Sequence, residues 1–424
     1  MRILHVSHVY HPATGGAELV IKELSERFAA AGHAVSVYTS NALTSVAFVD
    51  KSYPLLPAGE EIVNGVRVRR FPVWRRGRTL LTKLLVRAWA GRWAFNDWIR
   101  TIWNGPVLPG LARAIARYRP EVVAAIPFPF LTMYYPFYAR WLRRFPIVLI
   151  PCLHPTDAWS FDRENMHRAA RAADAVIVFT DYERDQLLAH GARAERVHVI
   201  GLGITPAPFA YGNRRAFRER HGLTGEPVVT FVGRKDEHKG VLALIEAMEA
   251  VWRRLPEARL VLAGASTYSR ERIEQRLAAL PAAARNRVIS IDDFPESEKP
   301  DIYAGCDVFA LPSTVESFGL VYLEAWASRR PVVGCRTGAV SCLVRHGVDG
   351  MLIRPGDAAE LASTLITLLE DEPRRRAMGE AGREKVLREH TWEIAFERVS
   401  RVYQELTAPR GSKARVPRLT RSSR

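Results

Sequence analysis

Short apolar segments alternate with helical segments through the first half of the chain. Residues 17–31 have apolar side chains at helical spacing, and Gly32 follows where the turn at a helix C-terminus favours glycine. Buried strands are predicted in the segments RILHVSH, AVSVYT, VRVRRF, EVVAAI, PIVLI, AVIVF and VHVI. Short apolar strands between helices are typical of a parallel sheet that is covered on both faces. The first half therefore predicts an α/β domain.

The same alternation starts again after a break at 201–212. This break, GLGITPAPFAYG, is rich in glycine and proline, has no apolar period and predicts an interdomain linker. Beyond it, strands are predicted in VVTFVG, ARLVLAG, RVISI, DVFAL and PVVGC, and helices over 241–253, 317–329, 358–370, 373–389 and 391–406. We therefore expect the α/β class, with two Rossmann-like domains that face each other across a cleft.

The domain boundaries are placed where this pattern changes. Residues 1–204 are expected to form the first domain and residues 205–390 the second. Residues 391–407 are expected to form a C-terminal helix that crosses back to the first domain. The tail at 408–424 is basic, has no apolar stripe and is predicted to be disordered.

Composition indicates a folded protein whose charge is localised. The chain has 424 residues, of which 48% are hydrophobic and 25% charged, and its net charge is +16. Residues 65–100 contain ten Lys or Arg and one acid, and residues 408–424 contain six basic residues and no acid. The rest is almost neutral, which argues against a scaffold for nucleic acid, and no nucleic-acid partner is expected.

Four cysteines without a CxxC pair argue against both a disulfide scaffold and a structural zinc site. The first residues, MRILHVSHVYHP, lack the apolar core of a signal peptide. The uncharged run at 122–139 contains Pro127, Pro129 and Pro136, so a buried strand followed by a loop and a helix is favoured over a membrane span. We expect a cytoplasmic protein.

Candidate site residues follow four of the predicted strands, at the sheet edge where ligands of such domains bind. After the first strand, Gly15 and Gly16 precede a helix, where they either let an anion approach the backbone or simply form a flexible turn. After VVTFV, the loop GRKDEHKG contains Gly233, Arg234 and Lys239. Its cations and exposed amides suit a diphosphate, although a solvated charged loop would have the same composition.

The segment PSTVESFGLVYLEAWA contains Glu316 and Glu324, separated by seven residues. A helix that begins at 317 would leave the N–H groups of Phe318, Gly319 and Leu320 free for an anion and would place both carboxylates on one side. One carboxylate can accept from sugar hydroxyls and the other from ribose hydroxyls. The alternative makes Glu316 a helix cap and Glu324 a surface acid.

His154 follows the strand PIVLI, in the segment PCLHPTDAW. Its position suits a role in the site, although a lone histidine is often a packing residue. The chain contains no D-x-D triplet that would clamp a metal ion on a diphosphate, so no metal and no cofactor are expected.

Together, the segments FVGRKDEHKG, DVFALPSTVESFGLVYLEAWA and HGVDGMLIRPGD resemble the retaining glycosyltransferases of the family-4 type, which have the GT-B fold. The resemblance covers most of residues 1–406. The E-x7-E element is its specific part, and the GG turn and TDYERDQL support it. One departure is TGAVSCLV at 337–344, where the family often has a Gly-Gly-x-x-Glu run.

The resemblance implies a role for each candidate residue. Gly16 would approach the donor diphosphate, which Arg234 and Lys239 would hold. Glu316 would bind donor-sugar hydroxyls beside the Phe318–Leu320 amides, Glu324 would bind the ribose, and His154 would lie near the anomeric centre.

The resemblance also implies a UDP- or GDP-linked sugar donor, a glycan or lipid-linked acceptor and transfer on the same face of the sugar. Such an enzyme would serve cell-surface glycan, polysaccharide or glycolipid synthesis. Two alternatives are a nucleotide-sugar epimerase of the same fold and a non-catalytic binding protein. A dehydrogenase is disfavoured, because no G-x-G-x-x-G follows the first strand.

Residues 65–104 combine the basic excess with five of the ten tryptophans. Leu81, Leu84, Leu85 and Ala88 can share a helix face, with Lys83 and Arg87 elsewhere. This pattern suits a helix that lies on an anionic membrane and would place the enzyme on the inner face of that membrane. It suits equally an amphipathic helix packed on the sheet.

Overall fold

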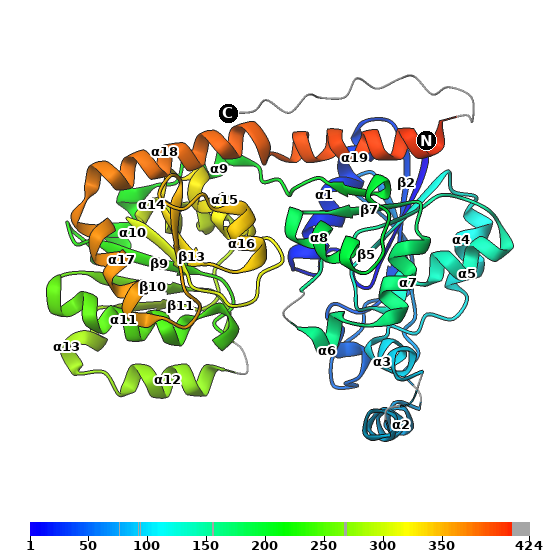
Figure 1. Ribbon diagram of the computed structural model, residues 1–424, viewed down its shortest axis with the longest axis horizontal. Coiled ribbons are helices and arrows are strands. Elements are labelled where there is room, and N and C mark those ends of the chain that lie inside the picture. The colour runs from blue at the N-terminus through cyan, green and yellow to red at the C-terminus, as the bar shows by residue number, and fades with distance from the viewer. Residues whose placement is uncertain (76, 92, 94, 155–156, 267–268, 409–424) are drawn as a thin grey trace.

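The computed structural model describes residues 1–408 apart from 76, 92, 94, 155–156 and 267–268, and it contains two α/β domains side by side (Figure 1). The two domains contain separate sheets, of eight and six strands. The predicted basic tail lies outside the described residues except for Ala408.

The first sheet has the strand order β3-β4-β2-β1-β5-β6-β7-β8, and all its neighbours are parallel except β3 and β4. Its strands are β1 (Arg2–Ser7), β2 (Ala34–Ser40), β3 (Gly59–Val63), β4 (Val66–Phe71), β5 (Val122–Ile126), β6 (Ile147–Leu149), β7 (Ala175–Val178) and β8 (Val197–Val199). Only β3 was not predicted, because this edge strand is mostly exposed and lacks an apolar run. The apolar run at 122–139 forms β5, a loop and α5, as expected.

The helices of the first domain are α1 (Gly16–Ala30), α2 (Arg78–Ala90), α3 (Asn96–Asn104), α4 (Leu111–Tyr118), α5 (Tyr135–Leu142), α6 (Ala158–Phe161), α7 (Glu164–Ala172) and α8 (Asp181–Ala189). Core side chains lie on both faces of the sheet. Ile3 belongs to the cluster that contains Phe28 of α1, whereas Leu4 belongs to the cluster that contains Ile115 of α4. Successive strand residues point to opposite faces, so a continuous apolar strand serves both layers.

The second sheet is entirely parallel, with the order β11-β10-β9-β12-β13-β14. Its strands are β9 (Val228–Val232), β10 (Arg259–Ala263), β11 (Val288–Ile291), β12 (Val308–Leu311), β13 (Val332–Cys335) and β14 (Gly350–Ile353). Its helices are α10 (Arg214–Arg220), α11 (Val241–Arg254), α12 (Arg270–Ala278), α13 (Ala282–Arg285), α14 (Lys299–Gly305), α15 (Leu320–Ala327), α16 (Gly338–Leu343), α17 (Ala358–Glu370) and α18 (Glu372–Glu389).

The chain passes between the domains twice. The predicted linker is not wholly irregular, since Pro206 starts a short helix, α9 (Pro206–Ala210). The second passage joins α18 to α19 (Trp392–Thr407), and these two helices run along the same side of both domains (Figure 1). The passages are hydrogen-bonded to each other, with 3.0 Å from Ile204 N to His390 O and 3.2 Å from Trp392 N to Ile204 O.

Helix α19 packs on the first domain. The Tyr403 ring stacks on Phe28 of α1 at 5.1 Å, and its hydroxyl lies 3.1 Å from His5 Nε2 in β1. His5 is fully buried, and this burial lowers the pKa of its imidazole to about 3. The last helix is therefore part of the core of the first domain.

The basic, tryptophan-containing segment forms α2 and α3 at the edge of the first domain (Figure 1). Leu85 and Ala88 of α2 are buried against Ile99 of α3, so this helix packs on another helix. Four apolar side chains of α2 remain exposed: Leu80, Leu84, Val86 and Trp89. In the described part of the chain, no helix is both long and apolar enough to cross a bilayer.

Candidate functional site

The loop after β9 contains the predicted diphosphate-binding cations. Two neighbouring basic residues of this loop, Arg234 and Lys235, point in different directions. Arg234 has a side chain that is 72% exposed. Lys235, its neighbour, is turned into the protein and lies 2.6 Å from Asp292. The Asp236 carboxylate accepts a hydrogen bond from Lys239 N at 3.0 Å and so holds the turn. Of the two adjacent cations, only Arg234 is presented outward.

Lys239 and Glu316 form an ion pair, with 2.5 Å between Nζ and Oε1. The loops that contain them touch at Gly240, where φ is +79° and a Cβ atom would lie 2.2 Å from Pro312 O. Only glycine fits this approach. The sequence predicted both residues but not their pairing, and Glu316 is not a helix cap.

Helix α15 begins at Leu320 and not at 317 as predicted. Gly319 has φ of +91°, which is outside the helical region, so it serves as the N-cap residue. The Phe318 ring lies 6.4 Å from Phe179 of the first domain and is buried between the domains. The amide of Leu320 is therefore at the helix N-terminus, whereas Phe318 and Gly319 lie ahead of it.

Glu324 is a buried residue of α15 and not a surface acid. Its carboxylate lies 2.8 Å from Lys299 Nζ through Oε1 and accepts from Tyr303 Oη at 2.8 Å through Oε2. Burial acts against the charge of Lys299, but Glu324 and Glu296 outweigh it and raise the pKa of this lysine. No hydrogen bond or ion pair among the described residues joins Glu324 to Glu316. The sequence analysis missed Lys299, whose only signal is a base in the acidic segment ESEKP.

His154 belongs to the first domain and faces the second. Burial lowers the pKa of its imidazole, and the charges that act on it include Glu316, which raises this pKa, and Lys239 and Arg234, which lower it. Its Nδ1 is buried and has no hydrogen-bond partner among the described residues. The His154 imidazole is thus a buried group of the first domain on which the charges of the Lys239–Glu316 pair act across the two domains.

Glu183 holds the backbone next to His154, a role that the sequence analysis missed. Its carboxylate accepts from Leu153 N and from Phe179 N, both at 2.7 Å. Burial raises the pKa of Glu183 to about 7, against the opposing effect of these hydrogen bonds. The available signal was the pattern T-x-x-E at Thr180, which is typical of a helix N-terminus.

The predicted glycine turn opens α1. A Cβ atom on Gly15 would lie 2.3 Å from a Glu18 carboxylate oxygen, whereas one on Gly16 would meet nothing within 4 Å. Glu18 in turn lies 3.2 Å from Nε2 of the buried His8. Gly16 therefore faces open space, and Gly15 makes room for a carboxylate that the sequence analysis had not considered.

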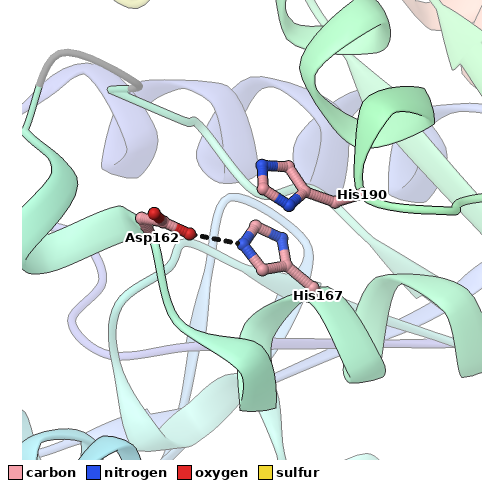
Figure 2. A group of neighbouring side chains, drawn as sticks. All are labelled: Asp162, His167 and His190. Atoms are coloured by element: carbon pink, nitrogen blue, oxygen red, sulfur yellow. Dashed lines mark hydrogen bonds and ion pairs between the residues drawn. The ribbon is translucent and has the colours of Figure 1, made fainter.

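Asp162, His167 and His190 form a group with metal-ligand chemistry in the first domain (Figure 2). Their ligand atoms lie within 4.8 Å of one another, and His167 Nε2 lies 3.0 Å from Asp162 Oδ1. The two imidazole rings are stacked at 3.7 Å and nearly parallel. An ion binds in the plane of an imidazole ring, so two stacked rings do not converge on one ion unless a ring turns.

The segment at 337–344 that departs from the family pattern lies between the domains. It forms α16, which contacts α8 of the first domain. A Cβ atom on Gly338 would lie 2.4 Å from the Tyr182 ring. The departure therefore falls where the two domains touch.

Two family models match the chain, one in each domain. Residues 213–385 match the model for glycosyl transferases group 1, and residues 15–203 match a glycosyl transferase 4-like domain. Over 243 residues the chain is 34% identical to the D-inositol 3-phosphate glycosyltransferase of Corynebacterium efficiens, a match that covers 55% of this chain and 57% of that protein. The chain thus spans little more than half the length of this relative.

Solved structures with the same fold cover nearly the whole chain. Anabaena Alr3699/HepE in complex with UDP and glucose matches with a TM-score of 0.71 and 21% identity, over 96% of this chain and 100% of that chain. Sucrose-phosphate synthase from Thermosynechococcus elongatus matches with a TM-score of 0.72 and 23% identity, over 96% and 99%. At these identities the likeness is one of fold, and it confirms the predicted two-domain architecture.

Proposed function

This chain belongs to the family-4 type of glycosyltransferases with the GT-B fold, and on that premise we propose that it transfers a sugar from a nucleoside diphosphate sugar to a hydroxyl group of a glycan or lipid-linked acceptor. The observation that carries the proposal is that Lys239 and Glu316, paired in the second domain, are near enough for their charges to act on His154 of the first domain. In this arrangement the second domain holds the donor and the first domain presents the acceptor.

Arg234 and Lys239 are the residues proposed to hold the diphosphate, together with the amides near Leu320 and the open backbone at Gly16. Arg234 is exposed and presents a planar fork of N–H donors, and Lys239 adds a point charge. The donor displaces Lys239 partly from Glu316, so Glu316 becomes free to accept from a sugar hydroxyl. Glu324, already oriented by Lys299 and Tyr303, retains lone pairs for the ribose hydroxyls.

The proposed reaction retains the configuration of the anomeric carbon. The acceptor oxygen bonds to that carbon as the bond from the carbon to the phosphate oxygen breaks, and the departing phosphate oxygen takes the acceptor proton. Negative charge then grows on the diphosphate, where preorganised cations stabilise it without a metal ion. Burial lowers the pKa of His154 and so favours its neutral form, which can orient the sugar without repelling Lys239.

The test is a binding screen followed by a transfer assay. UDP and GDP, and then their sugars, are added in a thermal-shift experiment, in which a ligand at 100 times its Kd stabilises the protein by about 2.7 kcal/mol. We expect one nucleotide to raise the Tm, and its sugar to be consumed when an acceptor is supplied. Release of an altered free sugar without acceptor would point instead to an epimerase, and no response to any nucleotide would overturn the proposal.

We also propose that α2 docks the enzyme on an anionic membrane at the cytoplasmic face. Its exposed residues include the apolar Leu80 and Val86 and the cations Lys83 and Arg87. Basic residues near such a surface contribute about 1 kcal/mol each. Lipid-linked acceptors would then be delivered to the first domain.

Vesicle co-sedimentation tests this docking. We expect binding to phosphatidylserine vesicles that is lost in Leu80→Glu/Val86→Glu. Leu142→Glu, an exposed leucine of α5, serves as the control and should leave binding intact. Equal binding to uncharged vesicles, or none to either kind, would exclude the membrane role.

A further inference from the structure

Two arginines lie buried close to each other at the packed helices α3 and α7 of the first domain. Arg163 precedes α7 and is 1% exposed, and Arg100 belongs to α3 and is 4% exposed. Burial lowers the pKa of both, and the charge of Arg100 further lowers the pKa of Arg163, to about 10. Two cations are thus held together away from water, which costs free energy unless an anion compensates them.

The protein supplies only part of that compensation. The Arg163 guanidinium makes no hydrogen bond with any described residue, and its Nε, Nη1 and Nη2 are all buried. Arg100 has Asp97 3.4 Å from its Nη1, but its Nε and Nη2 also lack partners within the described ranges. Buried polar groups are almost always paired, so this many free donors on two neighbouring side chains indicate a missing acceptor.

Indole rings stabilise the two guanidinium groups without using their N–H groups. Trp159 of α6 lies 4.6 Å from the Arg100 guanidinium and 5.6 Å from that of Arg163. Trp89 of α2 lies 5.4 Å from Arg100. Contacts of this kind offset part of the charge, while the N–H donors stay available for a planar, bidentate contact with an oxyanion.

Arg163 follows His154 in the same short segment, which links the arginine pair to this histidine. Asp157 N donates to His154 O at 2.9 Å, and the Phe161 ring lies 5.2 Å from the His154 ring. The charge of Asp157 acts on the pKa of both His154 and Arg163. The Trp159 ring lies over both guanidinium groups. Because this residue is 41% exposed, its side chain has room to turn aside.

We propose that Arg100 and Arg163 form a subsite for a phosphate group carried by the acceptor, which anchors the acceptor beside His154. The proposal rests on the transferase function proposed above, and it narrows the acceptor to a phosphorylated sugar, polyol or lipid. Phosphate fits better than carboxylate, because its several oxygens and double charge match two guanidinium forks.

The test uses inorganic phosphate with the full chain saturated with UDP, so that the donor's own anion site is occupied. We expect phosphate to raise the Tm of the wild-type protein, with chloride at equal ionic strength as the reference. Arg163→Met should lose this rise, and its phosphate Kd, measured by titration calorimetry, should weaken about ten- to hundredfold. Arg168→Met, in the helix α7 that follows Arg163 and with a side chain 74% exposed, is the matched control and should behave as wild type.

The Tm of the unliganded protein provides a second readout, for which a phosphate subsite and a purely structural arginine predict opposite changes. Because Arg163 is a buried cation without a partner, Arg163→Met should not lower the Tm in the absence of phosphate, and should raise it if anything. A purely structural arginine would show the reverse: a lower Tm and an unchanged phosphate response. If Arg163→Met does not fold, that also contradicts the proposal. Arg163→Lys keeps the charge but loses the planar fork of N–H donors, so its phosphate Kd shows how far phosphate binding depends on the fork.

The experiments distinguish failure of the proposed transferase function from failure of the proposed phosphate subsite. Nucleotide binding should be the same in all variants, so a protein that binds neither UDP nor GDP overturns the transferase function and leaves the phosphate measurement standing. A protein that binds UDP but shows no phosphate response with UDP present overturns the subsite alone. In a transfer assay, the subsite predicts a raised KM for a phosphorylated acceptor in Arg163→Met with kcat little changed.

Discussion

The two domains contribute charge to the site in opposite ways. In the second domain, three lysines are each paired with a carboxylate: Lys235 with Asp292, Lys239 with Glu316, and Lys299 with Glu324. In the first domain, His154 Nδ1 and the whole Arg163 guanidinium lack partners among the described residues. If the proposed function holds, the donor side is neutralised before a ligand binds, whereas the acceptor side is completed by the ligand itself.

The largest expected effect comes from breaking the paired side. Lys239→Ala and Glu316→Ala should each lower kcat by about 10²–10³, because each removes a preorganised group from the donor. Either single change leaves a half-buried charge alone and should also lower the Tm. The double variant Lys239→Ala/Glu316→Ala should recover the Tm but not the turnover, which separates the stabilising role of the pair from its catalytic role.

Arg215→Ala, which breaks an exposed ion pair with Glu219 in α10, controls for loss of a surface charge. Near-normal turnover in both single variants would show that this pair is not the donor site.

Low pH should lower the stability of the first domain, and of the passage from α18 to α19 that joins the domains, more than that of the second domain. Burial lowers the pKa of His5 to about 3 and that of His390 to about 4, below their unfolded value. A lowered pKa means that the neutral form stabilises the fold fully above the unfolded pKa, and that this contribution is lost as pH falls toward the folded value. Each histidine should therefore cost about 1.4 kcal/mol of unfolding free energy per pH unit between about 6.5 and 4.5.

Urea unfolding at a series of pH values measures this slope. His5→Asn should flatten the slope and lower stability at neutral pH, where the contact with Tyr403 is lost. An unchanged slope in that variant would assign the acid sensitivity to other groups.

Glu183→Gln tests whether His154 depends on a fixed backbone. The amide can accept from only one of Leu153 N and Phe179 N, and it places its own donor against the other. We expect a loss of about 1–3 kcal/mol in stability, together with a fall in kcat that nucleotide binding does not share. Chemical denaturation and a nucleotide titration measure the two effects, and a variant with normal kcat would show that Glu183 does not position His154.

The smallest effect should come from Tyr303→Phe. It removes one of two partners of Glu324, and Lys299 still holds the carboxylate at 2.8 Å, so the expected loss is about 0.5–1.5 kcal/mol. The donor KM should rise slightly with kcat unchanged. A large loss of kcat would mean that Glu324 has a greater part in the chemistry than orientation of the ribose.

The sequence was informative where a residue follows a strand and uninformative where a partner comes from a distant segment. Arg234, Lys239 and Glu316 were predicted from strand ends, and the strand pattern yielded both sheets except the edge strands β3 and β14. The Lys239–Glu316 pairing joins loops 77 residues apart, so no local pattern reveals it. Helix α15 was placed three residues early, because the left-handed backbone at Gly319 is not visible in a run of helix-forming residues.

Burial was the other property that the sequence did not disclose. Arg163 stands in the polar segment FDREN, where an arginine is expected to face solvent. Its burial arises from the packing of α3, α6 and α7, which are brought together only by the fold. The same holds for Glu183, which looks like an ordinary first-turn acid of α8.

The place of α19 in the first domain has a consequence for the order of synthesis. Domains generally fold as they leave the ribosome, the N-terminal one first. Here Tyr403, which is fully buried against Phe28 and His5, is made almost 400 residues after the strand it covers. The first domain therefore stays incomplete until the whole second domain has emerged, and a nascent chain stalled before residue 392 would expose this part of its core to chaperones.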